Sequence, residues 1–229
     1  IVLGQPDFFT DEIKCIGNYT IGNTLGTTGG YNNVCYGQNA LSTQSNVANY
    51  TANSNQLSKP TGLATNGSKL FVVDTGNNRV VYYPQLPVAG SSGAGTAAQI
   101  VIGVPSFGTY SAGTNGASGL RAPTGVAIGA AGFYVADTGN NRVLYFSNNT
   151  PKAHGPAASQ VFGQSDFTHS AADDSNQDGI PDQYLNSSGG YVYSPSIDTL
   201  DGPTAVTVSN GVLYVTDTGN NRVMEFTGS

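Results

Sequence analysis

The segment between Asp174 and Asp182 carries the residue types and the spacing best suited to chemistry. Its sequence is Asp-Ser-Asn-Gln-Asp-Gly-Ile-Pro-Asp, so oxygen-bearing side chains stand at its first, third, fifth and ninth positions. Gly179, at the sixth position, permits a sharp turn that brings a main-chain carbonyl toward the same centre. Carboxylate, amide and carbonyl oxygens are the ligands that Ca²⁺ prefers. We therefore predict a calcium site with five ligand residues: Asp174, Asn176, Asp178, Ile180 (through its carbonyl) and Asp182.

This pattern matches the first nine positions of the EF-hand type of calcium loop, and it resembles the calcium repeats of thrombospondin type 3. It departs from a complete EF-hand because Leu185 stands at the twelfth position, which usually carries Glu. A further carboxylate could complete the shell, and the candidates are Asp173, Asp198 and Asp201. The alternative interpretation of this segment is a solvated acidic turn.

Residues for acid–base or nucleophilic catalysis are sparse. The two histidines, His154 and His169, lie in separate polar segments, and the sequence indicates no Ser-His-Asp set, Cys-His pair or histidine metal cluster. A carboxylate pair of the glycosidase kind could come from Asp7, Asp166 and Asp201. We expect no catalysis, and a metal-dependent lyase or hydrolase is the alternative.

Cys15 and Cys35, the two cysteines, stand in one polar, glycine-rich segment. Free cysteines usually lie in apolar cores, so we favour a disulfide between them over two unrelated free thiols. In the chain-entropy model, closing a loop of about 20 residues stabilises a fold by about 3 kcal/mol. A disulfide predicts an oxidising location, extracellular or at the cell surface.

Charge and hydropathy exclude some classes of partner. Lys and Arg number 8 against 14 Asp and Glu, which gives a net charge of -6. Nucleic-acid binding requires clustered Lys and Arg, so we expect no nucleic-acid partner. No apolar run approaches the roughly 20 residues that span a bilayer, so we expect no membrane insertion. The chain begins at Ile1 without a signal sequence, and we expect that an export signal has been removed or that the sequence is part of a larger protein.

The element that organises the chain is Asp-Thr-Gly-Asn-Asn-Arg-Val, which occurs three times without change. Each copy lies between two short apolar runs, a pattern that predicts two strands joined by a hairpin turn. Gly and Asn tolerate the positive φ of tight turns, Asp bonds to nearby amides, and Arg can lie across the turn toward an Asp. We predict a structural role for these turn residues: Asp74, Asn77, Arg79, Asp137, Asn140, Arg142, Asp217, Asn220 and Arg222.

Two more elements repeat in fixed order around each turn. Pro-Thr and a short apolar stretch precede it at Pro60, Pro123 and Pro203, and Val-x-Gly-x-x-x-Phe follows at Val101 and Val161 and also opens the chain at Val2. Each unit thus has four strands in about 45 residues. The second strand is apolar on both faces and must be covered on both sides. We predict an all-β fold, a β-propeller of four-stranded antiparallel blades with three blades in this chain.

The stretch PTGVAIGAAGFYVADTGNNRVLYF resembles the NHL repeat, and VLGQPDF resembles the outer strand of secreted bacterial and archaeal proteins that string such repeats together. The resemblance implies a single NHL-like module over residues 1–229. Its expected parts are an outer strand (1–8), a disulfide-bearing insertion (9–59), two blades (60–107 and 123–167), a calcium-like insertion (168–202) and a partial blade (203–229). Domains of this type usually have six blades, so three blades form half of a ring or part of an open assembly.

The two ends of the chain read as complementary parts of one blade. The start supplies a fourth strand and the end supplies three strands, which predicts strand exchange between copies into a ring or a filament, or a fragment of a longer repeat protein. We expect an extracellular, non-catalytic binding or self-assembly module. A glycan- or peptide-binding lectin-like module is a further alternative, because tyrosines in the long insertions could stack on a ligand: Tyr31, Tyr36 and Tyr50.

Overall fold

The computed structural model describes residues 53–54, 56–86, 97–109, 111 and 113–227. The regular structure in these residues is almost entirely β, with two single turns of 3-10 helix, η1 (Thr75–Asn77) and η2 (Thr138–Asn140). Among them, no helix has the length and apolar character needed to cross a bilayer. The predicted first strand (1–8), Cys15, Cys35 and the insertion tyrosines lie outside the described residues.

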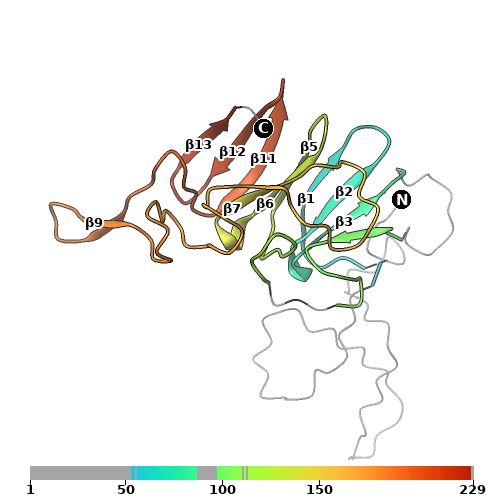
Figure 1. Cartoon of the computed structure of the whole chain (residues 1–229), viewed down its shortest axis with the longest axis horizontal. Helices are drawn as coiled ribbons and strands as arrows, with labels where there is room; N and C mark the ends of the chain where they lie inside the picture. The colour runs from blue at the N-terminus through green and yellow to red at the C-terminus, as the bar shows by residue number, and fades with distance from the viewer. Residues whose placement is uncertain (1–52, 55, 87–96, 110, 112, 228–229) are drawn as a thin grey trace, which may run out of the picture.

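The strands form three successive antiparallel sheets and one separate hairpin (Figure 1). The first sheet has the order β1 (Pro60–Thr65), β2 (Leu70–Asp74), β3 (Arg79–Tyr83), β4 (Ile100–Ile102). The second has the order β5 (Gly125–Ile128), β6 (Phe133–Asp137), β7 (Arg142–Phe146), β8 (Gln160–Phe162). The third contains β11 (Pro203–Ser209), β12 (Val212–Asp217) and β13 (Arg222–Phe226). The hairpin pairs β9 (Gln183–Leu185) with β10 (Tyr191–Tyr193) inside the acidic insertion.

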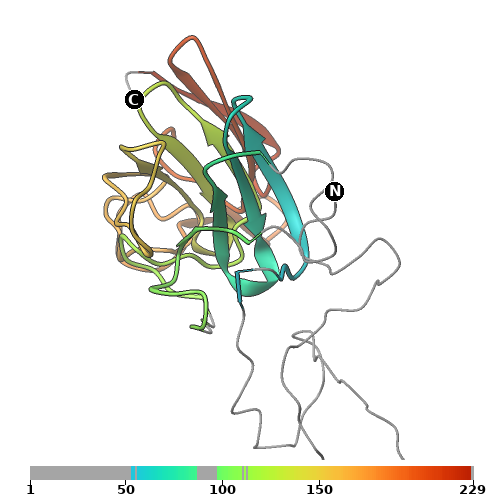
Figure 2. The ribbon, with the colours of Figure 1, turned by 90° about the vertical axis from the view of Figure 1, so that its right-hand side faces the viewer.

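Each sheet is a meander whose strands follow chain order, which confirms the all-β, propeller-type fold class. The two four-stranded sheets and the three-stranded one stand face to face, with β5 between β1 and β11 (Figure 2). The second strand is buried on both faces in the first two sheets: every residue of β6 is buried, and so is every residue of β2 after Leu70. In β12 buried residues alternate with partly exposed ones, so one face of the third sheet departs from this prediction. Hydrophobic clusters join the first sheet to the second and the second to the third.

Small residues allow the innermost strands to approach closely. A Cβ atom placed on Gly62 of β1 would lie 2.6 Å from the carbonyl oxygen of Thr124, and one on Gly125 of β5 would lie 2.9 Å from that of Thr204. Both contacts are with backbone atoms, which cannot move aside cheaply. Glycine is therefore required where neighbouring sheets converge.

Candidate functional site

The repeated motif forms the turn between the second and third strand of each sheet. In the first two copies the chain makes a 3-10 turn and then places the second Asn in the left-handed region, with φ of 51° at both Asn78 and Asn141. The sequence predicted a hairpin turn with positive φ on Gly or Asn, and the structure places it on Asn. The motif glycine has another purpose: a Cβ on Gly139 would lie 2.8 Å from the carbonyl oxygen of Arg121.

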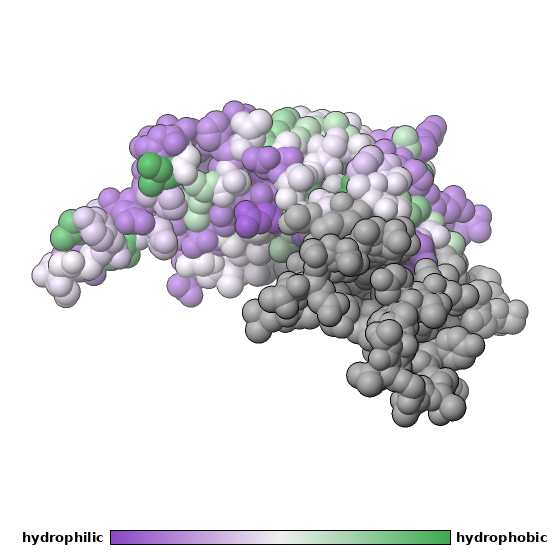
Figure 3. Space-filling model, turned by 90° about the horizontal axis from the view of Figure 1, so that it is seen from below, coloured by the Kyte–Doolittle hydropathy of each residue, from purple (hydrophilic) through white to green (hydrophobic). Residues whose placement is uncertain are grey.

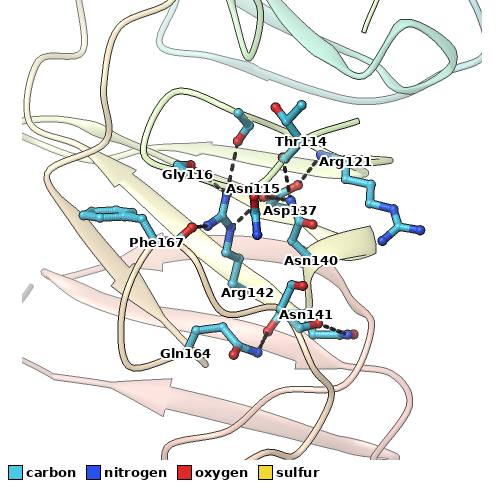
Figure 4. Close-up of polar contacts among 12 residues, drawn as sticks. Thr114, Asn115, Gly116, Arg121, Asp137, Asn140, Asn141, Arg142, Gln164 and Phe167 are labelled. Carbon is cyan, nitrogen blue, oxygen red and sulfur yellow. Dashed lines mark hydrogen bonds and ion pairs between the residues drawn. The ribbon is translucent and has the colours of Figure 1, made fainter. Parts of the chain in front are cut away.

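An ion pair holds each turn together and is fully buried in the first two copies, of which Figure 4 shows the second. Arg142 donates from Nε to Asp137 Oδ2 at 2.8 Å, and both side chains are fully buried. Asn140 also donates to this oxygen, at 2.9 Å, while the N–H of Arg121 donates to Asp137 Oδ1 at 2.7 Å. Burial raises the pKa of the Asp137 carboxyl, and the guanidinium and the N–H donors oppose that shift.

The same guanidinium also ties the outer strand and the preceding loop to the turn. Arg142 donates from Nη1 to the carbonyl of Phe167 at 2.6 Å, and from Nη2 to those of Gly116 and Gly119 at 2.9 and 3.1 Å. Phe167 is the last residue of the Val-x-Gly-x-x-x-Phe element that includes β8. The Arg predicted to lie across the turn therefore pairs with the Asp of its own sheet and fastens that sheet's fourth strand.

The first and third copies repeat this network with one difference. Arg79 pairs with Asp74 at 2.7 Å and donates from Nη1 to Phe107 at 3.3 Å. Arg222 pairs with Asp217 at 2.7 Å and donates from Nη2 to Ser196 and Thr199, at 2.7 and 2.8 Å. Its Nη1 has no corresponding Phe carbonyl among the described residues, and its side chain is 26% exposed against 1% for Arg79 and 0% for Arg142.

Sequence reasoning missed the role of the second Asn of the motif. Asn78 accepts the N–H of Ala122 at 2.7 Å, and Asn141 accepts that of Gly202 at 2.8 Å, so each Asn links its sheet to the next one. The signal in the sequence was the unchanged second Asn in all three copies.

The acidic segment folds around its own backbone N–H groups. Asp174 is buried and accepts the N–H of Asp178 at 3.1 Å and that of Gly179 at 2.7 Å. Asn176 also accepts from Asp178, at 3.0 Å, and Asp178 accepts from Ile180, at 2.9 Å. The Ser175 hydroxyl donates to Asp182 and lowers the pKa of that carboxyl.

The five predicted ligand residues therefore lie in one compact turn with Gly179 at a φ of 87°. In the part of the chain that the structure describes, no group of three or more His, Cys, Asp or Glu side chains is arranged to hold a metal ion. The donor types fit a hard cation, but these oxygens accept backbone hydrogen bonds here. Calcium binding thus stays a prediction.

Asp173 connects this segment to the third turn. Its Oδ1 accepts from Asn220 Nδ2 at 2.8 Å and from the Thr199 hydroxyl at 3.3 Å, and its Oδ2 is buried without a hydrogen-bond partner in the described residues. Burial raises the pKa of Asp201 nearby, with further contributions from the charges of Asp173 and Asp217. Of the three carboxylates considered for the calcium shell, Asp173 and Asp201 border the third turn, and Asp198 is exposed.

The histidines do not form a catalytic set with their described neighbours. His154 Nδ1 accepts the N–H of Val101 at 3.2 Å. His169 Nδ1 lies 2.9 Å from Asp166 and 3.5 Å from the Ser165 hydroxyl. A catalytic triad needs the acid and the nucleophile on opposite ring nitrogens, whereas here both contact the same one.

Comparison with known proteins identifies one repeat directly. Residues 200–226 match the family model of the NHL repeat. The three strands of the third sheet lie within this matched segment. The first two sheets share the turn motif, the order of the first three strands and the ion pair of the third sheet. No curated protein matches the chain in sequence.

Several solved structures are similar to parts of the chain. Glutaminyl cyclase from Myxococcus xanthus is 12% identical over 72% of this chain and 46% of its own, with a TM-score of 0.34. A streptogramin B lyase is 12% identical over 77% and 55%, with a TM-score of 0.32. Hydrazine synthase from Kuenenia stuttgartiensis is 13% identical over 76% and 37%, with a TM-score of 0.33. The chain thus spans about half the length of these proteins or less.

Proposed function

We propose that this chain is a non-catalytic, extracellular module that self-assembles by exchanging a β-strand between copies. The observation that carries the proposal is the outer edge of β13. In the first and second sheets a fourth strand pairs with the third one, β4 with β3 and β8 with β7. In the described part of the third sheet, β13 has β12 on one side and no strand on the other.

The two fourth strands share features that a strand pairing with β13 should also have. Both fourth strands belong to a Val-x-Gly-x-x-x-Phe element, place its Gly at positive φ (95° at Gly103, 87° at Gly163) and offer the Phe carbonyl to the turn arginine. In the described part of the chain Arg222 donates through Nε and Nη2 only, which leaves Nη1 for such a carbonyl. The third copy of the element is Val2–Phe8, and we propose that it pairs with β13 of another copy. An unpaired edge strand is a ready template for this addition.

We further propose that calcium stabilises the segment around Asp174 and, through Asp173, the third turn. The ligands would be those predicted from the sequence: Asp174, Asn176, Asp178, the carbonyl of Ile180 and Asp182. The cation would replace backbone N–H groups as the partner of these oxygens. Because Asp173 accepts from Asn220, ordering this segment would also order the sheet that receives the exchanged strand.

The experiment compares two substitutions in the N-terminal element by sedimentation velocity. Gly4→Val places a branched side chain where Gly103 and Gly163 have positive φ and a Cβ within 2.7 Å of a leucine side chain. Pro6→Ser is the matched control, because Ser165 occupies that position in the second copy. We expect Gly4→Val to weaken assembly and Pro6→Ser to preserve it. Equal assembly of the two variants would refute strand exchange.

A second candidate function is binding of a glycan or peptide ligand at the β9–β10 hairpin. Three tyrosines there are exposed: Tyr184 by 55%, Tyr191 by 72% and Tyr193 by 49%. Exposed aromatic side chains on a projecting hairpin suit stacking on sugars or peptides. Screening glycans and peptides against the protein and its Tyr191→Ala variant tests this, and a ligand bound equally by both would contradict it.

A further inference from the structure

Among the described residues no sheet covers one face of the third sheet, although its counterparts in the other two sheets are interfaces. We call the face that a sheet turns toward the next sheet its leading face, and the opposite one its trailing face. The leading face of the first sheet (Phe71, Val73, Val80, Tyr82) packs on the trailing face of the second (Val126, Phe133, Val135, Leu144, Phe146). The leading face of the second sheet (Tyr134, Val143, Tyr145) packs on the trailing face of the third (Val206, Val208, Leu213, Val215, Met224, Phe226).

Register places the corresponding leading-face residues of the third sheet. In the second sheet Ala136 of β6 lies between its strand partners Gly125 and Val143. In the third sheet Thr216 of β12 lies in the same way between Ala205 and Val223. Val223 is 65% exposed, whereas its equivalents Val80 and Val143 are fully buried. A shallow hollow runs over this face, and its lining includes Ala205, Thr207, Tyr214, Thr216 and Val223.

Threonine hydroxyls repeat across the two internal interfaces. Thr61 donates to the carbonyl of Thr124 at 2.9 Å, and Thr124 donates to that of Thr204 at 2.7 Å. The threonines of the turns donate to the residue just before each of these acceptors. Thr75 donates to the carbonyl of Pro123 at 2.7 Å, and Thr138 donates to that of Pro203 at 2.6 Å.

The third sheet carries the same pair of hydroxyls, Thr204 and Thr218, 2.6 Å apart. Among the described residues, no further sheet offers them carbonyls. Asn221 likewise occupies the place of Asn78 and Asn141, which accept an N–H from the next sheet, and it is exposed. The leading face of the third sheet therefore holds the donors and the acceptor of a third interface.

The first sheet presents the complementary atoms. Pro60 and Thr61 of the first sheet correspond to Pro123 and Thr124 of the second. Lys59 corresponds to Ala122 and Gly202, and all three have a positive φ: 48° at Lys59, 43° at Ala122 and 55° at Gly202. Leu63 corresponds to Val126, yet it is 68% exposed where Val126 is 6% exposed. The outer part of this trailing face, including Val72 and Val81, is already buried, so the free contact area lies along β1.

We propose that the leading face of the third sheet binds β1 of a second copy of this chain, in the register by which successive sheets pack within one chain. In this contact Thr204 and Thr218 donate to the carbonyls of Thr61 and Pro60, Asn221 accepts the N–H of Lys59, and Val223 packs toward Leu63. The contact is head to tail, because the two surfaces differ. It rests on the proposed self-assembly but uses a sheet face, whereas strand exchange uses a sheet edge.

Glu225 places a charge on this face where the other two sheets have a tyrosine. It stands at the position of Tyr82 and Tyr145, which are buried or half-buried. An exposed carboxylate here weakens an otherwise apolar contact. Glu225→Tyr should therefore tighten association, which a face exposed only to water would not do.

The test measures the dissociation constant of self-association by sedimentation equilibrium. Val223→Arg and Leu63→Arg should each weaken association by about tenfold or more, because each places a charge where an aliphatic side chain becomes buried. Ile197→Arg is the matched control at a residue that is 78% exposed outside this face. Circular dichroism confirms that each variant is folded. Unchanged association of both Val223→Arg and Leu63→Arg would overturn the proposal.

A mixing experiment identifies the partner surface. Val223→Asp and Leu63→Lys should each weaken association when alone, and an equimolar mixture should restore pairing, because the unchanged β1 of the first variant can bind the unchanged leading face of the second. Failure of the mixture to associate would contradict the head-to-tail pairing of these two surfaces. If Gly4→Val assembles normally while Val223→Arg does not, strand exchange is wrong and the face contact stands. The reverse result would overturn the face contact alone, and a wild-type monomer would overturn both.

Discussion

Replacing Arg142 with Met tests the claim that the repeated motif is a structural turn. The substitution keeps the length of the side chain and removes its charge. Asp137 is fully buried and would lose its 2.8 Å ion pair, while the carbonyls of Phe167, Gly116 and Gly119 would lose their donor. Breaking a buried pair by removing one partner costs about 3–5 kcal/mol, because the remaining charge is uncompensated.

The same change at Arg222 gives an internal comparison. Its side chain is 26% exposed and makes no described Nη1 contact, so water can reach the site after the substitution. We expect Arg222→Met to cost about 1.5–3 kcal/mol, the range for hydrogen bonds to charged groups. The structure therefore predicts that Arg142→Met lowers the free energy of unfolding by more than Arg222→Met does.

Urea denaturation at low protein concentration, followed by circular dichroism, gives the free energy of unfolding of each variant. The double variant Asp137→Asn, Arg142→Met serves as the control, because it also removes the buried negative charge and should regain part of the loss. A loss below about 1 kcal/mol for Arg142→Met, or a larger loss for Arg222→Met, would refute the reasoning.

Three other expectations concern the predicted calcium site, the carboxyl group of Asp201 and the close packing of the innermost strands. Millimolar calcium should raise the melting temperature of the protein and not that of Asp178→Ala, as measured by scanning fluorimetry; equal responses would exclude the predicted site. Asp201→Asn in calcium-free buffer should stabilise the fold at neutral pH, because a raised pKa in the folded state destabilises the ionised form. That gain should shrink as the pH falls through the folded pKa, where wild-type Asp201 is already protonated; a gain that grows in acid would contradict the sign. Gly62→Ala should lower the free energy of unfolding by about 1–3 kcal/mol, because the new Cβ clashes with Thr124. Gly108→Ala is the control and should lower it by about 0.5 kcal/mol or less, because nothing lies near its Cβ. Equal losses would contradict the claim that close packing requires Gly62.

The fold class could be predicted because local signals agreed with one another. Identical turns, apolar strands and Pro-Thr starts recur in fixed order, and a strand apolar on both faces has to be covered twice. The same order predicted that the last unit would lack its fourth strand. Among the described residues the third sheet contains β11, β12 and β13, and the division of the chain into blades and insertions stays a prediction.

The contacts between sheets could not be predicted from the sequence. The motif reads as a local turn, and the sequence does not show that Asn78 bonds to Ala122, 44 residues away. The hairpin of β9 and β10 was also missed, because its strands are short, exposed and embedded in a polar insertion. Such features depend on which backbones meet in space, and single-sequence patterns carry little of that information.

The most direct test of the account is the mass of the purified protein across a range of concentrations, measured by sedimentation equilibrium. Strand exchange at β13 and the open face around Val223 both predict particles of two or more chains at micromolar concentration, with dissociation upon dilution. A particle with the mass of a single chain at every concentration would contradict the proposed self-assembly.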